Sequence, residues 1–542
     1  MSEFLSTWVG VDDKAHLAVT VSGDAATAVR ALVPGLVADR VASKITAQDP
    51  TLWGRDAEDE SRIRLGWTTL HESSRLFLEE LEQLRGALES EGKSRVVLAG
   101  MGGSSLGPEV ICATYGMPLV TLDSTDPDQV RAAMGTDLAS TVLVVSSKSG
   151  GTVETDSARR VFESAFEAEG LDPRQHMVVV TDPDSPLHRQ SVETGYRAVF
   201  LADPHVGGRF SVLSAFGLVP SALAGVPVAE LLDEADAVSD SLGEDDEANP
   251  ALVLGAAMAG STRDKLIFSD HGSGLVGFPD WAEQLIAEST GKNGVGVLPV
   301  VAEPHAPEAE AADVIDTRVV SLDGDDEATG HGLAVGGTLG AQFLLWEYAV
   351  AVAGRILGIS PFDQPNVESA KVASRALLDA MPEPEPAAFV DDGIEVLGTP
   401  GLLDGIDTAE DALRAIEREL GDRGYVAVMA YLNREQFPAL AATRRAVAAR
   451  SGRPTTFGWG PRFLHSTGQF HKGGPAVGVF VQITGTFADD MDIPGRPFSF
   501  GGLVSAQAAG DAQVLADSGQ PVLRLRLTDV AHVARVTALL EG

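Results

Sequence analysis

A stretch of hydroxyl residues and glycines, SSKSGGTVETDS at 146–157, has the composition of an anion-binding turn. It follows the apolar run TVLVVS (141–146), which predicts a buried strand, and it leads into a predicted helix. A helix N-terminus offers unpaired N–H groups and partial positive charge, and Ser and Thr hydroxyls add further donors. The alternative is a cluster that only caps the helix, for which one or two hydroxyls suffice. The abundance of hydroxyls favours the anion site.

Four other segments combine small residues with single charged side chains. GMGGSSLGPE (100–109) predicts a second strand-to-helix turn, in which glycine lets backbone approach a ligand. Single charged residues stand out in GGRFSVLSAFGL (207–218), AEQLIAESTGKNG (282–294) and PFDQPNVESAK (361–371). These are Arg209, Glu288 and Lys371, and each taken alone is typical of an ordinary surface residue. The order of the segments along the chain carries more information than any one of them.

The composition excludes several classes of function. Net charge is −38, so the surface repels nucleic acid and anionic membranes, and we expect neither as a partner. One cysteine excludes an intramolecular disulfide framework and suits a cytoplasmic location, and MSEFLSTWVG lacks the basic start of a signal peptide. The apolar segment 338–357 contains Gln, Glu and Arg, which favours a buried core helix over a membrane span.

Common cofactor motifs do not fit. GMGGSS places serine where the third glycine of a dinucleotide-binding turn would stand, and GKS at 92–94 precedes its strand instead of following it. Neither HExxH nor CxxC occurs in the sequence. We therefore expect no metal and no cofactor.

Apolar runs and helical segments alternate along most of the chain, which predicts an α/β fold. Residues 1–64 form a predicted helical region, and 65–240 a first doubly wound parallel-sheet domain with strands at 95–100, 141–146 and 177–182. A second such domain is expected at 241–381. The segment PEPEPAAF (382–389) predicts a linker, and 382–542 forms a smaller C-terminal α/β domain.

The motifs and their order resemble the phosphoglucose isomerase family, a member of the sugar-isomerase (SIS) domain superfamily. The resemblance rests on GMGGSSLGPE, SSKSGGTVET, GGRFSVLSAFGL, AESTGK and FDQPNVESAK, and it covers about residues 65 to 375. Beyond residue 385 the chain resembles the extension of an actinobacterial-type subgroup and of transaldolase–isomerase fusions. The resemblance implies two SIS-type domains that act on a sugar phosphate.

The resemblance also implies roles for individual residues. Glu288 matches the base that moves a proton between C2 and C1, a task that suits a carboxylate whose pKa is raised by burial. Arg209 matches the cation beside the enediolate oxygen, and Lys371 matches the lysine of ring opening. The positions that match phosphate and sugar contacts are Ser147, Lys148, Ser149, Thr152, Gly103 and Ser104.

A histidine of the family is missing from its usual place. The family has a G-x-N-G-x-H-like stretch after the glutamate, whereas this chain reads VVAEPHAPEAEAADV (300–314). His305 is one candidate for the ring-opening role. The alternative interpretation is that it belongs to an ordinary exposed loop. A polar segment in the C-terminal region, GPRFLHSTGQFHKGGP (460–475), contains His465, His471 and Lys472 as other candidates. The alternative interpretation of this segment is a solvated loop without a role in the site. We hypothesise that this segment lies against the cleft and that His465 or His471 opens the ring.

The resemblance implies an aldose–ketose isomerase that interconverts glucose 6-phosphate and fructose 6-phosphate in glycolysis and gluconeogenesis. Alternatives are isomerisation of another sugar phosphate, such as mannose 6-phosphate, and a non-catalytic sugar-phosphate sensor. Retention of Glu288, Arg209 and Lys371 argues against the sensor, because binding alone does not need a base. Many family members are homodimers with shared sites, and the changed histidine segment leaves that sharing open here.

Overall fold

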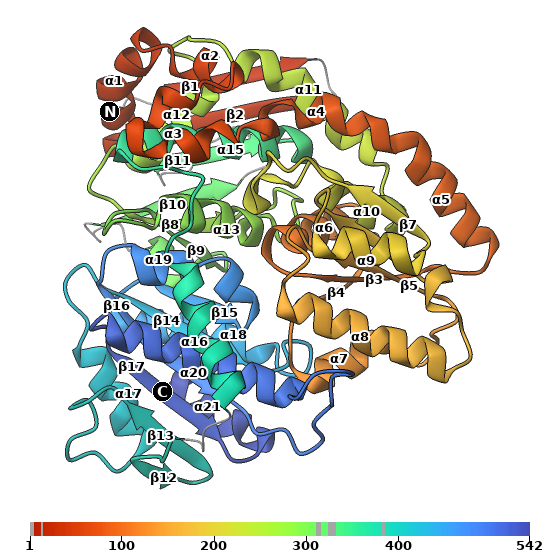
Figure 1. The fold of residues 1–542 in the computed structure, drawn as a ribbon. Helices are drawn as coiled ribbons and strands as arrows, with labels where there is room; N and C mark the ends of the chain where they lie inside the picture. The colour runs from red at the N-terminus through yellow and green to blue at the C-terminus, as the bar shows by residue number, and fades with distance from the viewer. Residues whose placement is uncertain (1–4, 12–14, 311–315, 323–331, 381–384) are drawn as a thin grey trace.

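The computed structural model describes residues 5–11, 15–310, 316–322, 332–380 and 385–542. Within these ranges the chain forms a five-stranded sheet and two six-stranded sheets, each with helices packed on it (Figure 1). The α/β class expected from the alternating pattern is confirmed. The expected boundary at 381–382 falls outside the described residues.

The first sheet is entirely parallel, and its order is β4-β3-β5-β6-β7. Its central strands are continuous apolar runs because helices cover both faces. Strand β4 lies on one side of β3 and strand β5 on the other, so the strand order reverses between β3 and β5. Open α/β sheets bind ligands at such a switch point. Its strands are β3 (Arg95–Gly100), β4 (Val120–Leu122), β5 (Thr141–Ser146), β6 (Met177–Thr181) and β7 (Ala198–Leu201), and its helices are α6 (Leu106–Thr114), α7 (Pro127–Met134), α8 (Val153–Ala168), α9 (Pro186–Thr194) and α10 (Ala215–Ala224).

The second sheet has the order β1-β2-β11-β10-β8-β9, and its strands β11, β10, β8 and β9 are parallel. The N-terminal hairpin extends it, because β2 pairs antiparallel with β11. Its strands are β1 (Leu5–Val11), β2 (Ala15–Val21), β8 (Lys265–Asp270), β9 (Leu298–Ala302), β10 (Thr317–Leu322) and β11 (Gly332–Gly337). Its helices are α11 (Val228–Leu242), α12 (Pro250–Ala259), α13 (Phe278–Thr290), α14 (Pro307–Glu310) and α15 (Leu339–Leu357).

The start of the chain differs from the expected helical region. Residues 5–11 and 15–21 form the paired antiparallel strands β1 and β2, and the helices follow only afterwards. Strand β2 also pairs with β11, which lies more than 300 residues along the chain, and local sequence pattern does not reveal that pairing. The helices of this region are α1 (Gly23–Ala38), α2 (Val41–Thr46), α3 (Glu58–Arg62), α4 (Leu70–Ser73) and α5 (Leu78–Ser90).

The C-terminal region forms a third sheet of order β12-β13-β17-β16-β14-β15, in which β17, β16, β14 and β15 are parallel. Its strands are β12 (Phe389–Asp391), β13 (Ile394–Gly398), β14 (Tyr425–Tyr431), β15 (Thr455–Trp459), β16 (Gly478–Thr484) and β17 (Val522–Leu527). Its helices are α17 (Ala409–Arg418), α18 (Ala439–Ser451), α19 (Gly468–Gly473), α20 (Phe500–Asp517) and α21 (Val533–Glu541). The remaining helix, α16 (Val367–Ala380), packs along α20 (Figure 1).

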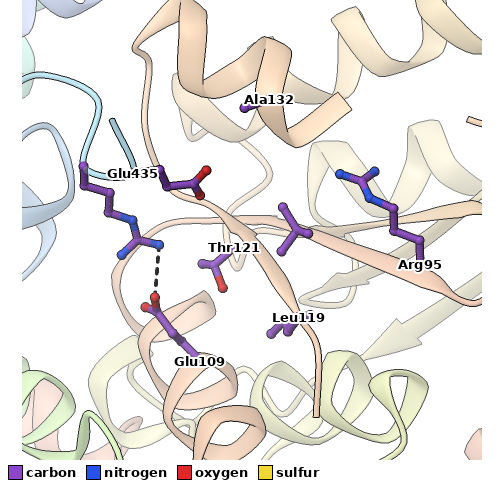
Figure 2. A pocket seen from close by; sticks show the side chains of 8 residues that line it. Arg95, Glu109, Leu119, Thr121, Ala132 and Glu435 are labelled. Atoms are coloured by element: carbon purple, nitrogen blue, oxygen red, sulfur yellow. Dashed lines mark ion pairs between the residues drawn. The ribbon is translucent and has the colours of Figure 1, made fainter. Parts of the chain in front are cut away.

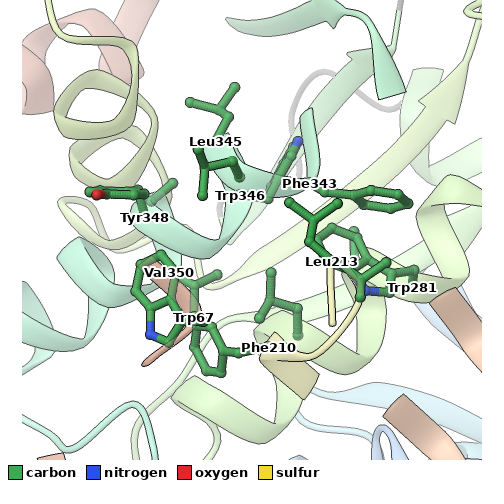
Figure 3. Packing of buried hydrophobic residues seen from close by; sticks show 14 of the residues in the cluster. Trp67, Phe210, Leu213, Trp281, Phe343, Leu345, Trp346, Tyr348 and Val350 are labelled. Atoms are coloured by element: carbon green, nitrogen blue, oxygen red, sulfur yellow. The ribbon is translucent and has the colours of Figure 1, made fainter. Parts of the chain in front are cut away.

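The apolar core around α15 fixes one side of the site. Tyr348 of α15 packs edge-on against Trp67 with ring centroids 5.0 Å apart, and Trp67 stacks on Phe210 at 5.3 Å (Figure 3). Phe210 is fully buried and directly follows Arg209. The core therefore immobilises the turn that carries Arg209. Helix α15 is the apolar segment that the sequence assigns to the core, and no helix among the described residues is long and apolar enough to cross a membrane.

Candidate active site

The hydroxyl-rich turn links the end of β5 to the N-terminus of α8. Ser147 Oγ donates to Thr152 Oγ1 over 3.1 Å, so two of the expected anion ligands converge, while Ser149 is exposed. Gly150 has φ +66°, and a Cβ there would lie 2.6 Å from the Leu187 backbone nitrogen, so the turn requires glycine. The turn has the geometry of an anion site at the positive end of a 16-residue helix.

Lys148 points away from the hydroxyls of this turn. Its Nζ lies 2.6 Å from Asp182 Oδ2 and 3.2 Å from the Pro204 carbonyl oxygen. The charge of Lys148 is therefore balanced by Asp182 at the end of the neighbouring strand.

The turn after β3 contacts two other parts of the site. A Cβ at Gly103 would lie 1.9 Å from the Gly208 carbonyl oxygen, and one at Gly102 would lie 2.8 Å from the carbonyl oxygen of His465. Glycine is thus needed because two other backbone segments approach the turn closely. Gly103 and Ser104 lie beside the Arg209 turn, as expected for neighbouring parts of one site.

Arg209 and Glu288 form a buried pair, with Nη1 and Oε2 3.5 Å apart. Arg209 Nε also donates to Ser289 Oγ over 2.8 Å, and its Nη1 donates to Gln364 Oε1 over 2.8 Å. Its Nη2 donates to the Pro361 carbonyl oxygen over 2.6 Å. Arg209 therefore joins α13 to the loop before α16 and leaves its guanidinium fixed beside the carboxylate.

Burial raises the pKa of Glu288, and the positive charges of Arg209, His465, Lys371 and Lys292 oppose that rise. A carboxyl with a raised pKa is a stronger base once ionised, which suits reversible proton transfer near neutral pH. The structure thus places a carboxyl of raised pKa beside a fixed cation.

Lys292 stabilises the same loop from α13's C-terminal side. Its Nζ contacts Asp363 Oδ1 at 2.7 Å, and burial, followed by the charge of Arg209, lowers its pKa to about 8. Lys371 lies on α16, where it is exposed, and its charge lowers the pKa of both Glu154 and Glu288. Lys371 is therefore close enough to Glu154 and Glu288 to act electrostatically on both carboxylates.

The segment 460–475 lies against the site, as hypothesised from the sequence. Gln284 Nε2 donates to the His465 carbonyl oxygen over 2.7 Å and lies 3.5 Å from Glu288 Oε2. The His465 ring Nε2 lies 3.1 Å from Glu154 Oε1, in the first turn of α8. His465 therefore connects the anion turn to the helix that carries Glu288.

The other two histidines lie in different surroundings. His471 is buried, with Nδ1 2.9 Å from the Tyr425 hydroxyl, and burial lowers its pKa to about 3, so the ring stays neutral and packs in the core. His305 is 73% exposed and lies 3.3 Å from Glu310. Lys472 forms a buried ion pair with Asp511 at 2.5 Å. The structure brings none of these three into contact with Glu288 or Arg209, so the ring-opening hypothesis for His471 loses its geometric basis.

The sequence analysis did not identify three residues that the structure places at the site, Glu154, Gln284 and Gln507. Glu154 lies within the hydroxyl-rich motif, and Gln284 stands one helical turn before Glu288, so both positions carried a signal. Gln507 lies in an alanine- and glycine-rich helix and carried none. The one group of metal-ligating side chains among the described residues is His71, Glu72 and Asp236, and it includes no residue of the site.

A separate pocket of about 440 Å³ lies between the first sheet and the C-terminal region (Figure 2). It is bordered by Glu109, whose carboxylate pairs with Arg434 at 3.0 Å and with Arg462 at 2.5 Å. None of the expected site residues lines it. Its lining residues are Arg95, Glu109, Leu119, Val120, Thr121, Ala132, Arg434 and Glu435.

The fold and site define an α/β protein with one parallel sheet, a second sheet in which four parallel strands are extended by the antiparallel strands β1 and β2, and a third, mixed sheet in the C-terminal region. The crystal structure of a glucose-6-phosphate isomerase from Chlamydia trachomatis shares this fold, with a TM-score of 0.55 and 19% identity over 70% of this chain and 90% of that chain. A hypothetical protein from Thermus thermophilus gives a TM-score of 0.52 and 25% identity over 64% of this chain and 95% of that chain.

Residues 71–293 match the family model of phosphoglucose isomerase. The glucose-6-phosphate isomerase of Geobacter sulfurreducens is 38% identical over 212 residues, which cover 36% of this chain and 40% of the relative. That of Geobacter sp. (strain M21) is 30% identical over 346 residues, or 52% of this chain and 65% of the relative. The chain thus spans between about two fifths and two thirds of these curated relatives. The resemblance to the phosphoglucose isomerase family is confirmed, while Lys371 and the C-terminal domain lie beyond the matched range.

Proposed function

We propose that this protein interconverts glucose 6-phosphate and fructose 6-phosphate by moving a proton between C2 and C1. The observation that carries the proposal is the buried Glu288 carboxylate held 3.5 Å from the Arg209 guanidinium. A protein that only bound a sugar phosphate would need the anion turn, but it would gain nothing from a carboxylate with a raised pKa. The relatives named glucose-6-phosphate isomerase support the choice of substrate.

In this mechanism each side chain has a defined task. Ser147, Thr152 and the N-terminus of α8 bind the phosphate group. Glu288 removes the proton from C2 of the open-chain sugar and returns it to C1, with a cis-enediol as the intermediate. Arg209 stabilises the negative charge that develops on the enediol oxygen.

Opening of the sugar ring requires a group that can exchange a proton with the ring oxygen and the C1 hydroxyl. We assign this task to His465 together with Lys371. His465 is hydrogen-bonded to Glu154. Burial alone would raise the pKa of Glu154, but the hydrogen bond and charge of His465, together with the charge of Lys371, outweigh it, so the pKa is lowered overall. An ionised Glu154 can accept a hydrogen bond from the imidazole and so fix the orientation of the ring.

A coupled assay tests the activity directly. Glucose 6-phosphate formed from fructose 6-phosphate is oxidised by a dehydrogenase. In a parallel reaction mannose 6-phosphate is the substrate, and an auxiliary glucose-6-phosphate isomerase converts the fructose 6-phosphate formed from it into the glucose 6-phosphate that the dehydrogenase oxidises. Conversion of fructose 6-phosphate well above the rate with mannose 6-phosphate supports the proposal. Binding of the sugar phosphate without conversion would instead favour the sensor.

The assignment of His465 has its own test. His465→Ala should lose most activity on the cyclic sugar phosphate and retain it on an open-chain analogue, because only the cyclic form requires ring opening. His305→Ala is the matched control, since that ring is exposed and contacts Glu310. Equal activity of His465→Ala and the parent on both substrates would return the ring-opening task to Lys371 and water.

A further inference from the structure

The amide of Gln507, on α20, is buried between the C-terminal domain and the first domain. Its Nε2 donates to Glu154 Oε1 over 2.6 Å, and its Oε1 accepts from Thr125 Oγ1 over 2.8 Å. His465 Nε2 lies 3.1 Å from the same Glu154 oxygen. His465 and Gln507 thus share one carboxylate oxygen, and both come from the C-terminal domain.

The environment leaves Gln507 little freedom. Gln507 is 4% exposed, Glu154 is 7% exposed, and Thr125 is fully buried. Because the Thr125 hydroxyl donates to the amide oxygen, the amide nitrogen is the end that faces Glu154. Solvent has poor access to this position, so a lost N–H donor is not readily replaced by water.

Helix α20 also holds the segments that carry His465 and Lys371. Asp511, one turn after Gln507, forms the buried ion pair with Lys472 of α19. Helix α16 packs along α20 (Figure 1), and a Cβ at Gly510 would lie 2.8 Å from the Ser374 backbone nitrogen. One helix therefore supports His465, Lys371 and Glu154 at once.

We propose that Gln507 is a positioning residue of the active site, which holds the Glu154 carboxylate toward His465. This inference rests on the ring-opening task proposed for His465. It makes the C-terminal domain part of the catalytic apparatus, because Gln507 acts through Glu154 without touching the sugar.

The charged groups that act on Glu154 are His465 from the segment before α19 and Lys371 from α16. In Gln507→Leu these two remain, and the carboxylate loses one N–H donor. The pKa of Glu154 should therefore rise, and the acid limb of kcat for the cyclic substrate should move to higher pH.

Three variants test the proposal. Gln507→Leu should lower kcat on the cyclic sugar phosphate by about ten- to a hundredfold, the range for one hydrogen bond to a charged group. KM should stay within about threefold of the parent, and activity on the open-chain analogue should persist. Gln513→Leu, at an exposed glutamine of the same helix that contacts Asp517, should match the parent.

Gln507→Glu is the isosteric variant that separates positioning from folding. While the introduced carboxyl is protonated, it can donate its O–H to Glu154, whereas its ionised form repels that carboxylate. The ratio of the kcat of Gln507→Glu to that of Gln507→Leu should therefore rise as pH falls. A constant ratio, or a Gln507→Leu kcat equal to that of Gln513→Leu, would overturn the proposal.

A second readout separates this proposal from the proposed function. If the parent converts no sugar phosphate, the function fails, and the His465 imidazole signal in NMR spectra then decides the positioning role. That signal, identified by its loss in His465→Gln, should shift in Gln507→Leu and stay fixed in Gln513→Leu. An unchanged signal in Gln507→Leu would overturn the positioning role.

Discussion

Replacement of Glu288 by Gln tests the proton transfer at the centre of the proposed reaction. The amide has the size of the carboxyl but is not basic. Arg209 keeps its contacts with Ser289, Gln364 and the Pro361 carbonyl oxygen, so the geometry of the site should survive. Substrate should still bind, while the proton at C2 should no longer exchange.

The size of the effect follows from the loss of the base. General acid–base catalysis contributes about 10²- to 10⁴-fold, which corresponds to about 2.7 to 5.4 kcal/mol of transition-state stabilisation. No other carboxylate is paired with Arg209 among the contacts of the described site, so we expect a loss near the upper end of this range.

The raised pKa of Glu288 also makes the free energy of unfolding depend on pH. The native pKa of Glu288 is raised above that of the unfolded chain, so its contribution to stability is greatest at low pH and is lost as pH rises through the native value. Burial of the ionised carboxylate costs stability at neutral pH, but its removal leaves the buried Arg209 guanidinium without its paired carboxylate. The melting temperature of Glu288→Gln is therefore measured beside the rate, so that loss of the base is distinguished from unfolding.

The assay measures exchange of C2-bound hydrogen of glucose 6-phosphate with solvent deuterium by NMR, beside the coupled rate. Binding of fructose 6-phosphate is measured by calorimetry. We expect an unchanged affinity within about threefold and an exchange rate at least about a hundredfold lower. Exchange within tenfold of the parent would refute the role of Glu288 as base.

Two further predictions concern the pH profile and the anion turn. Because burial raises the pKa of Glu288, kcat/KM of the parent should fall on the acid side at a pH above the ordinary glutamate value of 4.5, and an acid limb at or below 4.5 would contradict the burial argument. Replacement of both Ser147 and Thr152 by Ala removes two neutral donors worth about 1.5–3 kcal/mol each to a charged phosphate, so KM should rise at least tenfold. Equal use of unphosphorylated glucose by the parent protein would show that the turn serves another purpose.

The sequence by itself determined the α/β class, the anion turn and the principal charged residues of the site. These features are local, since a buried parallel strand, a glycine turn and a helix N-terminus are each encoded within about a dozen neighbouring residues. The motif order added the family resemblance, and with it Glu288, Arg209 and Lys371. The reading of residues 1–64 as helical failed at strands β1 and β2, because β2 is held in the second sheet by its pairing with β11, far along the chain.

Only the tertiary structure decided which histidine accompanies the site. His465 and His471 stand six residues apart in one polar segment, yet one contacts Glu154 and the other is buried against Tyr425. The difference arises because His465 ends the 3₁₀ turn Arg462–His465, whereas His471 lies on the separate short helix α19, and sequence spacing alone does not reveal which partner each side chain meets. Gln507 reaches Glu154 from 353 positions away, a contact created by the packing of the C-terminal domain onto the first.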